Sequence, residues 1–357
     1  MKKKSILFIL PDLHAGGAER IVITIANHLP RDRFSPAILL LRKEGPYLEI
    51  LEKDVEIIDI KTPRIRHSLW PIFKEIRKRK PEIVFCGFGE INAYFSIFIK
   101  FFTKIKFIAR ETNVVSQHIT RKEIRFFYKF YNNYDKIICQ SDDMKDDLLQ
   151  NFKIKSEKIS KINNPVDFDF IDERLEGSVM PETFKEDYKN VVAIGNLSHR
   201  KGFDRLLTVF NHLKQHKVLL HILGDGRDHD KLHQLKEELG LENVIFHGVQ
   251  KNPYPFLKFA DLFVLSSRYE GFPNVLLEAG ACGCYALANN CKGGIHEIIQ
   301  PNTNGEIADI ENHEVFAQKI KEILEKTNDK EAIRKSIQSR FSKEIILEKY
   351  FDLFDKI

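Results

Sequence analysis

Short apolar runs alternate with longer amphipathic stretches along the whole chain. The runs that predict strands in the first half cover residues 5–10, 34–41, 55–60, 82–87, 104–110 and 135–141. A second series covers residues 190–196, 218–226, 244–248, 261–267, 285–289 and 305–309. Short buried strands separated by helices are typical of a parallel sheet whose faces are covered by crossover helices. The pattern therefore predicts an α/β protein in which the same arrangement occurs twice.

The interval between the two series predicts a linker. Residues 163–190 contain Pro165, Pro181, several acids and no sustained hydrophobic period. A chain of 357 residues also exceeds what one hydrophobic core usually organises. We expect Rossmann-like domains over residues 1–172 and 173–340. The last helix, within residues 341–357, belongs to neither series and is expected to pack back on the first domain.

Composition favours a globular protein of the cytoplasm. Hydrophobic residues make up 43% of the chain and charged residues 30%. The first apolar run stops at Pro11, which makes it too short for a secretory signal peptide. Five scattered cysteines favour reduced thiols over a disulfide framework. Three of them lie near His296, but their spacing fits no common zinc pattern, so we interpret them as small core residues.

The positive charge is concentrated in the first half of the chain. Residues 1–170 carry 31 Lys and Arg against 22 Asp and Glu, whereas residues 171–357 carry 25 against 29. Much of this charge accompanies Trp70 and other apolar residues at helical spacing between residues 61 and 80. Two interpretations stay open: a solvated helix before a buried strand, or a basic amphipathic helix that lies on anionic lipid.

An apolar stretch at residues 91–109 has the hydrophobicity of a membrane span. Lys100, Lys104 and Lys106 interrupt it. Charges inside or at the end of a span are costly, so we expect a helix that leads into a buried strand. Attachment to a bilayer surface is the alternative.

Two segments have the residue types that bind phosphate. Gly16 and Gly17 stand between the first predicted strand and a helix, where backbone amides and the helix dipole favour anions. His199, Arg200 and Lys201 follow the strand at residues 190–196, and such cations suit a diphosphate. Taken alone, the first segment can equally be a structural turn and the second an exposed basic turn.

A pair of carboxylates is the third chemical signal. Glu270 and Glu278 flank a Gly-Phe-Pro turn, and the predicted helix begins near Asn274. Ligands of open α/β sheets bind at the carboxyl ends of strands. A carboxylate there can accept hydrogen bonds from neighbouring sugar hydroxyls. The alternative is that the two acids serve only as helix caps or surface ion pairs.

Together these segments resemble one family. The motifs AGGAER, GNLSHRKGFDRLL, ILGDGRDHDKL and SSRYEGFPNVLLEAG are similar to those of the retaining glycosyltransferases of family 4, and the resemblance covers nearly the whole chain. It implies the GT-B fold, an α/β class with two Rossmann-like domains that face each other across a cleft.

The resemblance also assigns roles to residues. Glu278 would bind the ribose hydroxyls, and Glu270 with the amides of residues 271–275 would hold the transferred sugar. Lys201 and Arg200 would neutralise the diphosphate, which makes Glu270, Lys201 and Arg200 the catalytic candidates. The full donor set is Gly16, Gly17, Asn196, Arg200, Lys201, Val249, Glu270, Gly271, Phe272, Pro273, Asn274, Val275 and Glu278. Gly294 and Glu297 match a supporting loop.

The sequence departs from the family pattern at two positions. Asn196 stands where many members have an arginine, so Arg200 is expected to carry more of the phosphate contact. Glu111 and Thr112 stand where many members have a histidine after the fifth strand. Arg110, Glu111 and Asn113 therefore become the candidates for acceptor contact, with His118 as a distant substitute.

The function that the resemblance implies is retaining transfer of a hexose or N-acetylhexosamine from a UDP-linked donor. The departing diphosphate would itself accept the acceptor's proton, so we expect no enzymic nucleophile, metal or other cofactor. The expected acceptor is a growing, lipid-linked glycan of cell-surface polysaccharide or lipopolysaccharide, met at the cytoplasmic face of the inner membrane. No nucleic-acid partner is expected.

Three alternatives stay open. A GT-B epimerase or phosphorylase would share the same donor site, and so would a nucleotide-sugar-binding protein without catalysis. A dehydrogenase is disfavoured, because neither glycine-rich segment has the G-x-G-x-x-G spacing of a dinucleotide site.

Overall fold

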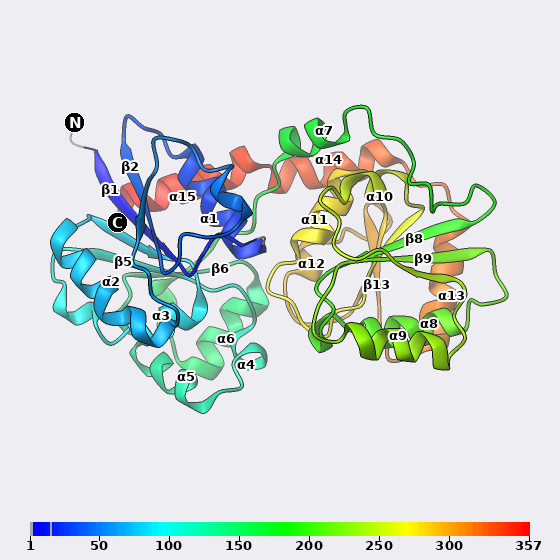
Figure 1. Ribbon diagram of the computed structural model, residues 1–357, viewed down its shortest axis with the longest axis horizontal. Coiled ribbons are helices and arrows are strands. Elements are labelled where there is room, and N and C mark those ends of the chain that lie inside the picture. The colour runs from blue at the N-terminus through cyan, green and yellow to red at the C-terminus, as the bar shows by residue number, and fades with distance from the viewer. Residues whose placement is uncertain (1–2, 15) are drawn as a thin grey trace. The chain divides into compact units, whose positions relative to one another are not determined.

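The computed structural model describes residues 3–14 and 16–357, and these divide into two compact units. Unit 1 contains the residues up to Pro165 together with Glu344–Ile357, and unit 2 contains Val166–Lys343. Each unit has one fully parallel sheet with helices on its faces (Figure 1). The sequence boundary that we predicted at residue 172 lies inside helix α7 (Phe168–Leu175).

Unit 1 is built on a seven-stranded sheet in the order β3-β2-β1-β4-β5-β6-β7. Its strands are β1 (Lys4–Leu10), β2 (Phe34–Leu40), β3 (Glu56–Asp59), β4 (Ile83–Cys86), β5 (Lys106–Arg110), β6 (Lys136–Cys139) and β7 (Ile159–Lys161). Its helices are α1 (Gly17–His28), α2 (Ile65–Arg79), α3 (Gly89–Phe95), α4 (Val115–His118), α5 (Lys122–Phe127), α6 (Asp142–Phe152) and α15 (Lys343–Lys356), with 3-10 turns η1 (Pro46–Leu48), η2 (Ile99–Phe101), η3 (Tyr128–Asn133) and η4 (Ser156–Lys158).

Helix α15 closes the core on one face of this sheet. Tyr350 and Phe354 are fully buried there, packed with α1 and with Phe8 and Phe85 of the central strands. Helices α2 to α6 contribute to a second core on the other face. The burial of two aromatic rings explains why the chain returns to unit 1 after completing unit 2.

Unit 2 is built on a six-stranded sheet in the order β10-β9-β8-β11-β12-β13. Its strands are β8 (Lys189–Ile194), β9 (Val218–Leu223), β10 (Val244–Phe246), β11 (Leu262–Leu265), β12 (Ala286–Asn289) and β13 (Gly305–Ala308). Its helices are α7, α8 (Phe203–Asn211), α9 (His229–Glu238), α10 (Tyr254–Phe259), α11 (Asn274–Ala281), α12 (Ile295–Ile298), α13 (His313–Leu324) and α14 (Lys330–Phe341), and η5 (His199–Lys201) is a 3-10 turn.

The structure corrects the sequence reading in two places. The predicted strands are present with ends shifted by a few residues, but β7 was not predicted, because a three-residue edge strand has too short a pattern. The segment interpreted as a linker contains helix α7. Asp167 caps this helix by accepting a hydrogen bond from the amide of Phe170, and Phe168 and Ile171 are buried against unit 2.

No helix among the described residues is both long enough and apolar enough to cross a bilayer. The apolar stretch at residues 91–109 forms the end of α3, the turn η2 and most of β5. It is a helical segment that leads into a buried strand, as predicted.

A pair of histidines lies in the core of unit 2. His221 on β9 is fully buried, and its ring bonds Asn190 at 3.1 Å and His247 at 3.0 Å. Burial, together with the His247 ring, lowers the pKa of His221 to about 3. The folded unit therefore holds this imidazole neutral at pH values where the unfolded chain is protonated.

We predict that His221 makes unit 2 acid-sensitive. Between the ordinary histidine pKa near 6.5 and about 3, only the unfolded state takes up this proton, so stability falls as the pH falls. The His221→Gln variant should show a slope of unfolding free energy against pH that is shallower by up to about 1.4 kcal/mol per pH unit. Urea unfolding between pH 7 and 5 measures it, with the exposed His212→Gln variant as the control. Equal slopes in both variants would contradict the prediction.

Candidate active site

The carboxylate of Glu270 is the centre of a charged group at the carboxyl edge of the unit 2 sheet. Its Oε1 atom lies 2.6 Å from Lys201 Nζ, and its Oε2 atom lies 2.7 Å from Arg200 Nη1. Ser267 Oγ donates a further hydrogen bond of 2.7 Å to Oε1. The three residues predicted to be catalytic are therefore brought into direct contact.

This carboxylate is buried and charged. Glu270 is only 4% exposed. Burial alone would raise its pKa, but the charges of Lys201 and Arg200 lower the pKa to about 2. A buried anion is tolerated because two cations and a hydroxyl compensate the loss of water.

The cations come from the turn η5, which follows β8. Glycine at position 202 ends this turn with a φ of +66°, and a β-carbon there would lie 2.2 Å from the carbonyl oxygen of Ser266. Gly195 leaves room for the aliphatic stem of Lys201. Small residues thus let the turn pack directly against the segment that follows β11.

The segment Glu270–Pro273 leads from β11 into helix α11. Its conformation is fixed by the loop at residues 292–294, since Glu270 N donates to Lys292 O and Gly294 N donates to Gly271 O. A β-carbon on Gly294 would lie 2.1 Å from the Phe272 ring. This contact gives the predicted supporting loop a physical role.

The remaining donor candidates of unit 2 lie along the same edge of the sheet. Asn274 and Val275 open helix α11, and Glu278 follows about one turn later with 8% of its surface exposed. Asn196 follows β8 and is exposed. Val249 follows β10 and is 74% exposed, which leaves this side chain available to a ligand.

In unit 1, Gly16 is the N-cap of α1 and Gly17 its first residue, at the carboxyl end of β1. As a glycine, Gly16 provides no side-chain cap for this helix end. A β-carbon on Gly16 would clash with the carboxylate of Glu19, so Glu19 lies against this glycine. Burial raises the pKa of Glu19.

Two of the three acceptor candidates line one pocket of unit 1. The pocket has a volume of about 150 Å³ and contains Glu111 and Asn113. Its other lining residues are Phe88, Gly89, Glu90, Thr112, Val115, His118, Ile119, Thr120, Arg121 and Ile124. His118, the distant substitute of the sequence reading, lines the same pocket.

Glu111 is held by a ring of buried polar groups. Tyr131 donates a hydrogen bond of 2.5 Å to Oε1, Tyr128 donates one of 3.2 Å to Oε2, and the Asn92 amide lies 3.4 Å from Oε1. Burial raises the pKa of this carboxyl even though these groups hydrogen-bond to it. The side chain is fixed in place beside the pocket.

Arg110 has different surroundings. Its guanidinium is 1% exposed, and it donates hydrogen bonds to Tyr350 on α15 at 3.2 Å and to Asn164 at 2.6 Å. It does not line the pocket of Glu111 and Asn113. These contacts tie β5 to the returning helix.

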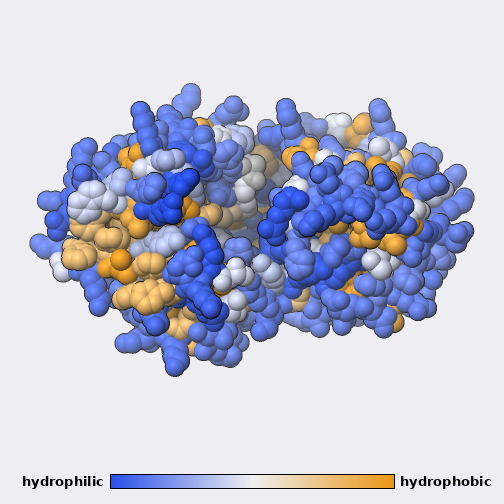
Figure 2. Space-filling model, turned by 60° about the horizontal axis from the view of Figure 1, so that its bottom comes forward, coloured by the Kyte–Doolittle hydropathy of each residue, from blue (hydrophilic) through white to orange (hydrophobic). Residues whose placement is uncertain are grey.

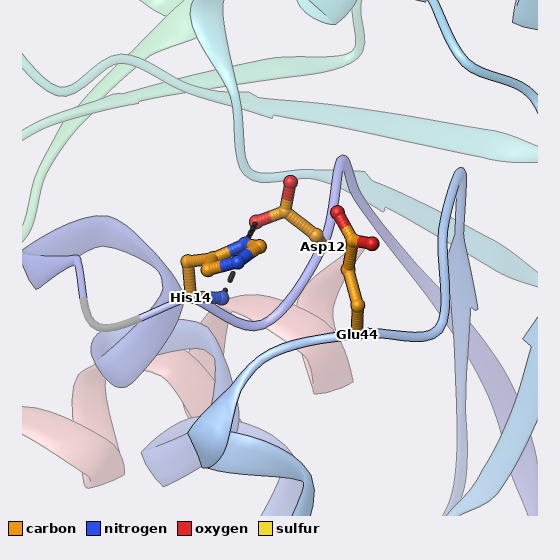
Figure 3. Close-up of side chains that lie close together, drawn as sticks. All are labelled: Asp12, His14 and Glu44. Atoms are coloured by element: carbon orange, nitrogen blue, oxygen red, sulfur yellow. Dashed lines mark hydrogen bonds and ion pairs between the residues drawn. The ribbon is translucent and has the colours of Figure 1, made fainter.

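Asp12, His14 and Glu44 come together near the carboxyl ends of β1 and β2 (Figure 3). Each offers an atom that can bind a metal, and these atoms lie within 4.8 Å of one another. Arg42, however, pairs with Asp12 at 2.8 Å and with Glu44 at 3.1 Å. The cluster already contains its own cation, so we assign it no metal.

Sequence reasoning missed several residues that support the site. Ser266, Ser267 and Arg268 open the motif SSRYEGFPNVLLEAG, and that position was the only available signal. Asp204 stands in the motif GNLSHRKGFDRLL, but a single acid in the first turn of a helix is common and does not indicate its partner.

Comparison with known proteins decides the family. Residues 15–170 match the model "Glycosyltransferase Family 4", and residues 179–340 match "Glycosyl transferases group 1". The chain belongs to the family 4 glycosyltransferases. It is thus an enzyme that transfers a sugar, and the epimerase, phosphorylase and non-catalytic alternatives are not favoured.

Relatives of nearly full length are glycosyltransferases. One from Campylobacter jejuni is 27% identical over 350 residues, with 92% of each chain covered, and is named N-acetylgalactosamine-N,N'-diacetylbacillosaminyl-diphospho-undecaprenol 4-alpha-N-acetylgalactosaminyltransferase. The amylovoran biosynthesis glycosyltransferase AmsD of Erwinia amylovora is 22% identical, with 96% of this chain and 97% of AmsD covered.

A solved structure confirms the fold class. Anabaena HepE, crystallised in complex with UDP and glucose, aligns with a TM-score of 0.82 at 21% identity, covering 99% of each chain. The predicted GT-B class is therefore correct.

Proposed function

We propose that this glycosyltransferase moves a hexose or N-acetylhexosamine from a UDP-sugar to a growing, lipid-linked glycan in cell-surface polysaccharide synthesis. The observation that carries the proposal is the buried Glu270 carboxylate between Lys201 and Arg200. The relatives support its two substrates: HepE was crystallised with UDP, and the Campylobacter enzyme is named for a diphospho-undecaprenol substrate.

The donor is proposed to bind along the carboxyl edge of the unit 2 sheet. Lys201 and Arg200 neutralise the diphosphate. In unit 1, the backbone amides of Gly16 and Gly17 at the start of α1 are proposed to bind phosphate. Glu270 and the amides of residues 271–275 hold the sugar. Glu278 accepts hydrogen bonds from the ribose hydroxyls, while Asn196 lies beside the phosphates and Val249 beside the base.

The reaction is proposed to retain the anomeric configuration. As the bond to the diphosphate lengthens, negative charge grows on the leaving oxygen, and Lys201 and Arg200 stabilise it without reorganising. The acceptor hydroxyl attacks from the same face, and its proton passes to the departing phosphate. Because two fixed cations meet the developing charge, we propose that no metal ion or cofactor is required.

The acceptor is proposed to enter the pocket of unit 1. Glu111, Asn113 and neighbouring polar residues line it, and such groups recognise sugar hydroxyls. Arg110 was predicted to contact the acceptor. Because this residue is buried, we propose that it affects acceptor binding only indirectly.

The membrane is proposed to meet an aromatic and basic surface of unit 1. Trp70, Phe101 and Phe126 are 57%, 63% and 50% exposed, and Figure 2 shows apolar side chains gathered on a face of this unit. Phe73 links two of them, since its ring stacks on Trp70 and meets Phe101 edge to face. Cations lie over these rings: Lys74 over Trp70, Arg77 over Phe73 and Lys129 over Phe126.

Aromatic side chains with cations beside them suit the interface of an anionic bilayer. We therefore propose that the protein is cytoplasmic and attaches peripherally to the inner membrane face, where a lipid-linked acceptor is found.

Lys201→Ala and Glu278→Ala are predicted to lower transfer at least about 100-fold, because the first removes a cation that meets the charge growing on the diphosphate and the second removes the group that anchors the ribose. Radiolabelled UDP-sugars, screened first for slow hydrolysis without acceptor, provide the assay. Circular dichroism checks that both variants are folded.

The matched comparison is Glu111→Gln. It should raise KM for the acceptor and leave slow donor hydrolysis unchanged, because this residue belongs to unit 1 and the acceptor pocket. Full activity of both donor-side variants would refute the proposed function. An epimerase or phosphorylase would instead convert the UDP-sugar without any acceptor.

The mechanism predicts a product of unchanged anomeric configuration, formed equally well in the presence of EDTA. Proton NMR of the product measures the anomeric coupling, and initial rates with EDTA or with added magnesium measure the metal dependence. An inverted product would exclude the same-face mechanism. A loss of activity in EDTA that magnesium restores would show that Lys201 and Arg200 are not sufficient.

Membrane attachment predicts binding to vesicles that contain anionic lipid, and weaker binding as salt screens the charges. Replacing Trp70, Phe101 and Phe126 together by serine should reduce sedimentation with these vesicles at least about tenfold, because the rings no longer enter the interface. Val315→Ser, at a 56% exposed site of unit 2, is the control. Equal binding of the native protein to neutral vesicles would count against the electrostatic part of the proposal.

A further inference from the structure

The turn η5, which carries Arg200 and Lys201, is held in place by hydrogen bonds to its backbone carbonyl groups. Arg268 Nη1 donates to the carbonyl of His199 at 2.6 Å, and Arg268 N donates to the carbonyl of Arg200 at 2.7 Å. Ser266 Oγ donates to the carbonyl of Lys201 at 2.8 Å. All three carbonyl groups of η5 are thus bound by the segment that follows β11.

The guanidinium of Arg268 is fixed in turn by Asp204. Nη1 lies 2.8 Å from Asp204 Oδ1, and Nη2 lies 2.6 Å from Oδ2, so the ion pair is bidentate. Hydrogen bonding to Asp204 raises the pKa of Arg268. Asp204 lies in the first turn of α8, directly after η5.

We propose that Arg268 is a positioning residue of the transfer reaction. It joins the carbonyl groups of η5 to the first turn of α8, and so fixes the place from which Lys201 and Arg200 meet the diphosphate. Arg268 itself need not touch the donor. The inference rests on the proposed role of those two cations and names the group that orients them.

The geometry favours this role over a merely structural ion pair. A surface Arg and Asp pair adds little stability, but here the same guanidinium also bonds the backbone beside the two functional cations. Displacing a catalytic group by about 1 Å can cost about 100-fold in rate. Because lysine has no planar fork, it cannot bond His199 O and both oxygens of Asp204 in this arrangement.

The chain contains a matched control. Arg334 on α14 also pairs with an aspartate, Asp172, at 2.7 Å, and donates to a backbone carbonyl, that of Ala281, at 2.6 Å. Its side chain is 23% exposed, against 24% for Arg268. It belongs to the same unit, and the groups that it bonds, Asp172 and the Ala281 carbonyl, lie outside η5, so its replacement measures the general cost of losing such an arginine.

The experiment compares Arg268→Leu, Arg268→Lys and Arg334→Leu by steady-state kinetics, by calorimetric titration with UDP and by thermal unfolding. Arg268→Leu should lower kcat/KM for the donor about 30- to 100-fold and weaken UDP binding, while KM for the acceptor stays within about twofold. Arg268→Lys should recover only part of this loss. Arg334→Leu should keep kcat/KM within about threefold, whatever its effect on Tm.

Two results would overturn the inference. One is a kcat/KM of Arg268→Leu that stays near the native value while Lys201→Ala is inactive. The other is an equal loss in Arg268→Leu and Arg334→Leu that follows their loss of folded protein. If Arg268→Leu does not fold, Asp204→Asn tests the same ion pair with Arg268. Native donor kinetics in that variant would also reject the positioning role of Arg268. Native activity of Lys201→Ala would instead refute the proposed function itself.

Discussion

The ion pairs of Glu270 with Lys201 and Arg200 are the interaction on which the site of unit 2 depends. Lys201 and Arg200 are adjacent and repel each other, and a carboxylate is costly to bury. The carboxylate reduces the repulsion between the cations, and the cations stabilise the buried carboxylate. The low pKa of Glu270 reflects this mutual dependence. The result is a rigid group that contains negative and positive charge side by side at the edge of a sheet. Such a group can meet sugar hydroxyls and a diphosphate together.

The parallel sheet determines where this group lies. Strands β8 and β11 are neighbours, so the turn after one and the loop after the other meet at the same edge. Gly202 then allows two backbone segments to approach to a distance that a side chain would prevent, and Gly294 leaves room for the Phe272 ring. Hydrogen bonds to backbone carbonyl groups, donated by Ser266, by the Arg268 guanidinium and by the Arg268 amide, hold η5 in place. This explains how flexible Lys and Arg side chains can be presented from a fixed base.

Unit 1 also has a parallel sheet, but different side chains lie at the carboxyl end of its strand β5. Its buried Glu111 is surrounded by tyrosine hydroxyls beside a small polar pocket, whereas Arg110, the next residue in sequence, ties β5 to helix α15. Adjacent residues at a strand end point to opposite faces, so one faces the pocket and its neighbour faces the core. The pocket and the attachment of helix α15 therefore meet at one strand end.

The sequence by itself determined the two α/β units, most of the strands that build them and the family, because hydrophobic period and glycine-rich turns are local properties. It also indicated Glu270, Lys201 and Arg200, since they lie in recognisable motifs. It did not reveal β7, helix α7 or the separation of Arg110 from Glu111. Only the tertiary structure placed Arg268 on the backbone of η5, paired it with Asp204, and brought His118 and Glu111 to the same pocket. Contacts of this kind join residues far apart in the chain, and no periodic pattern along one segment records which side chain another segment will meet.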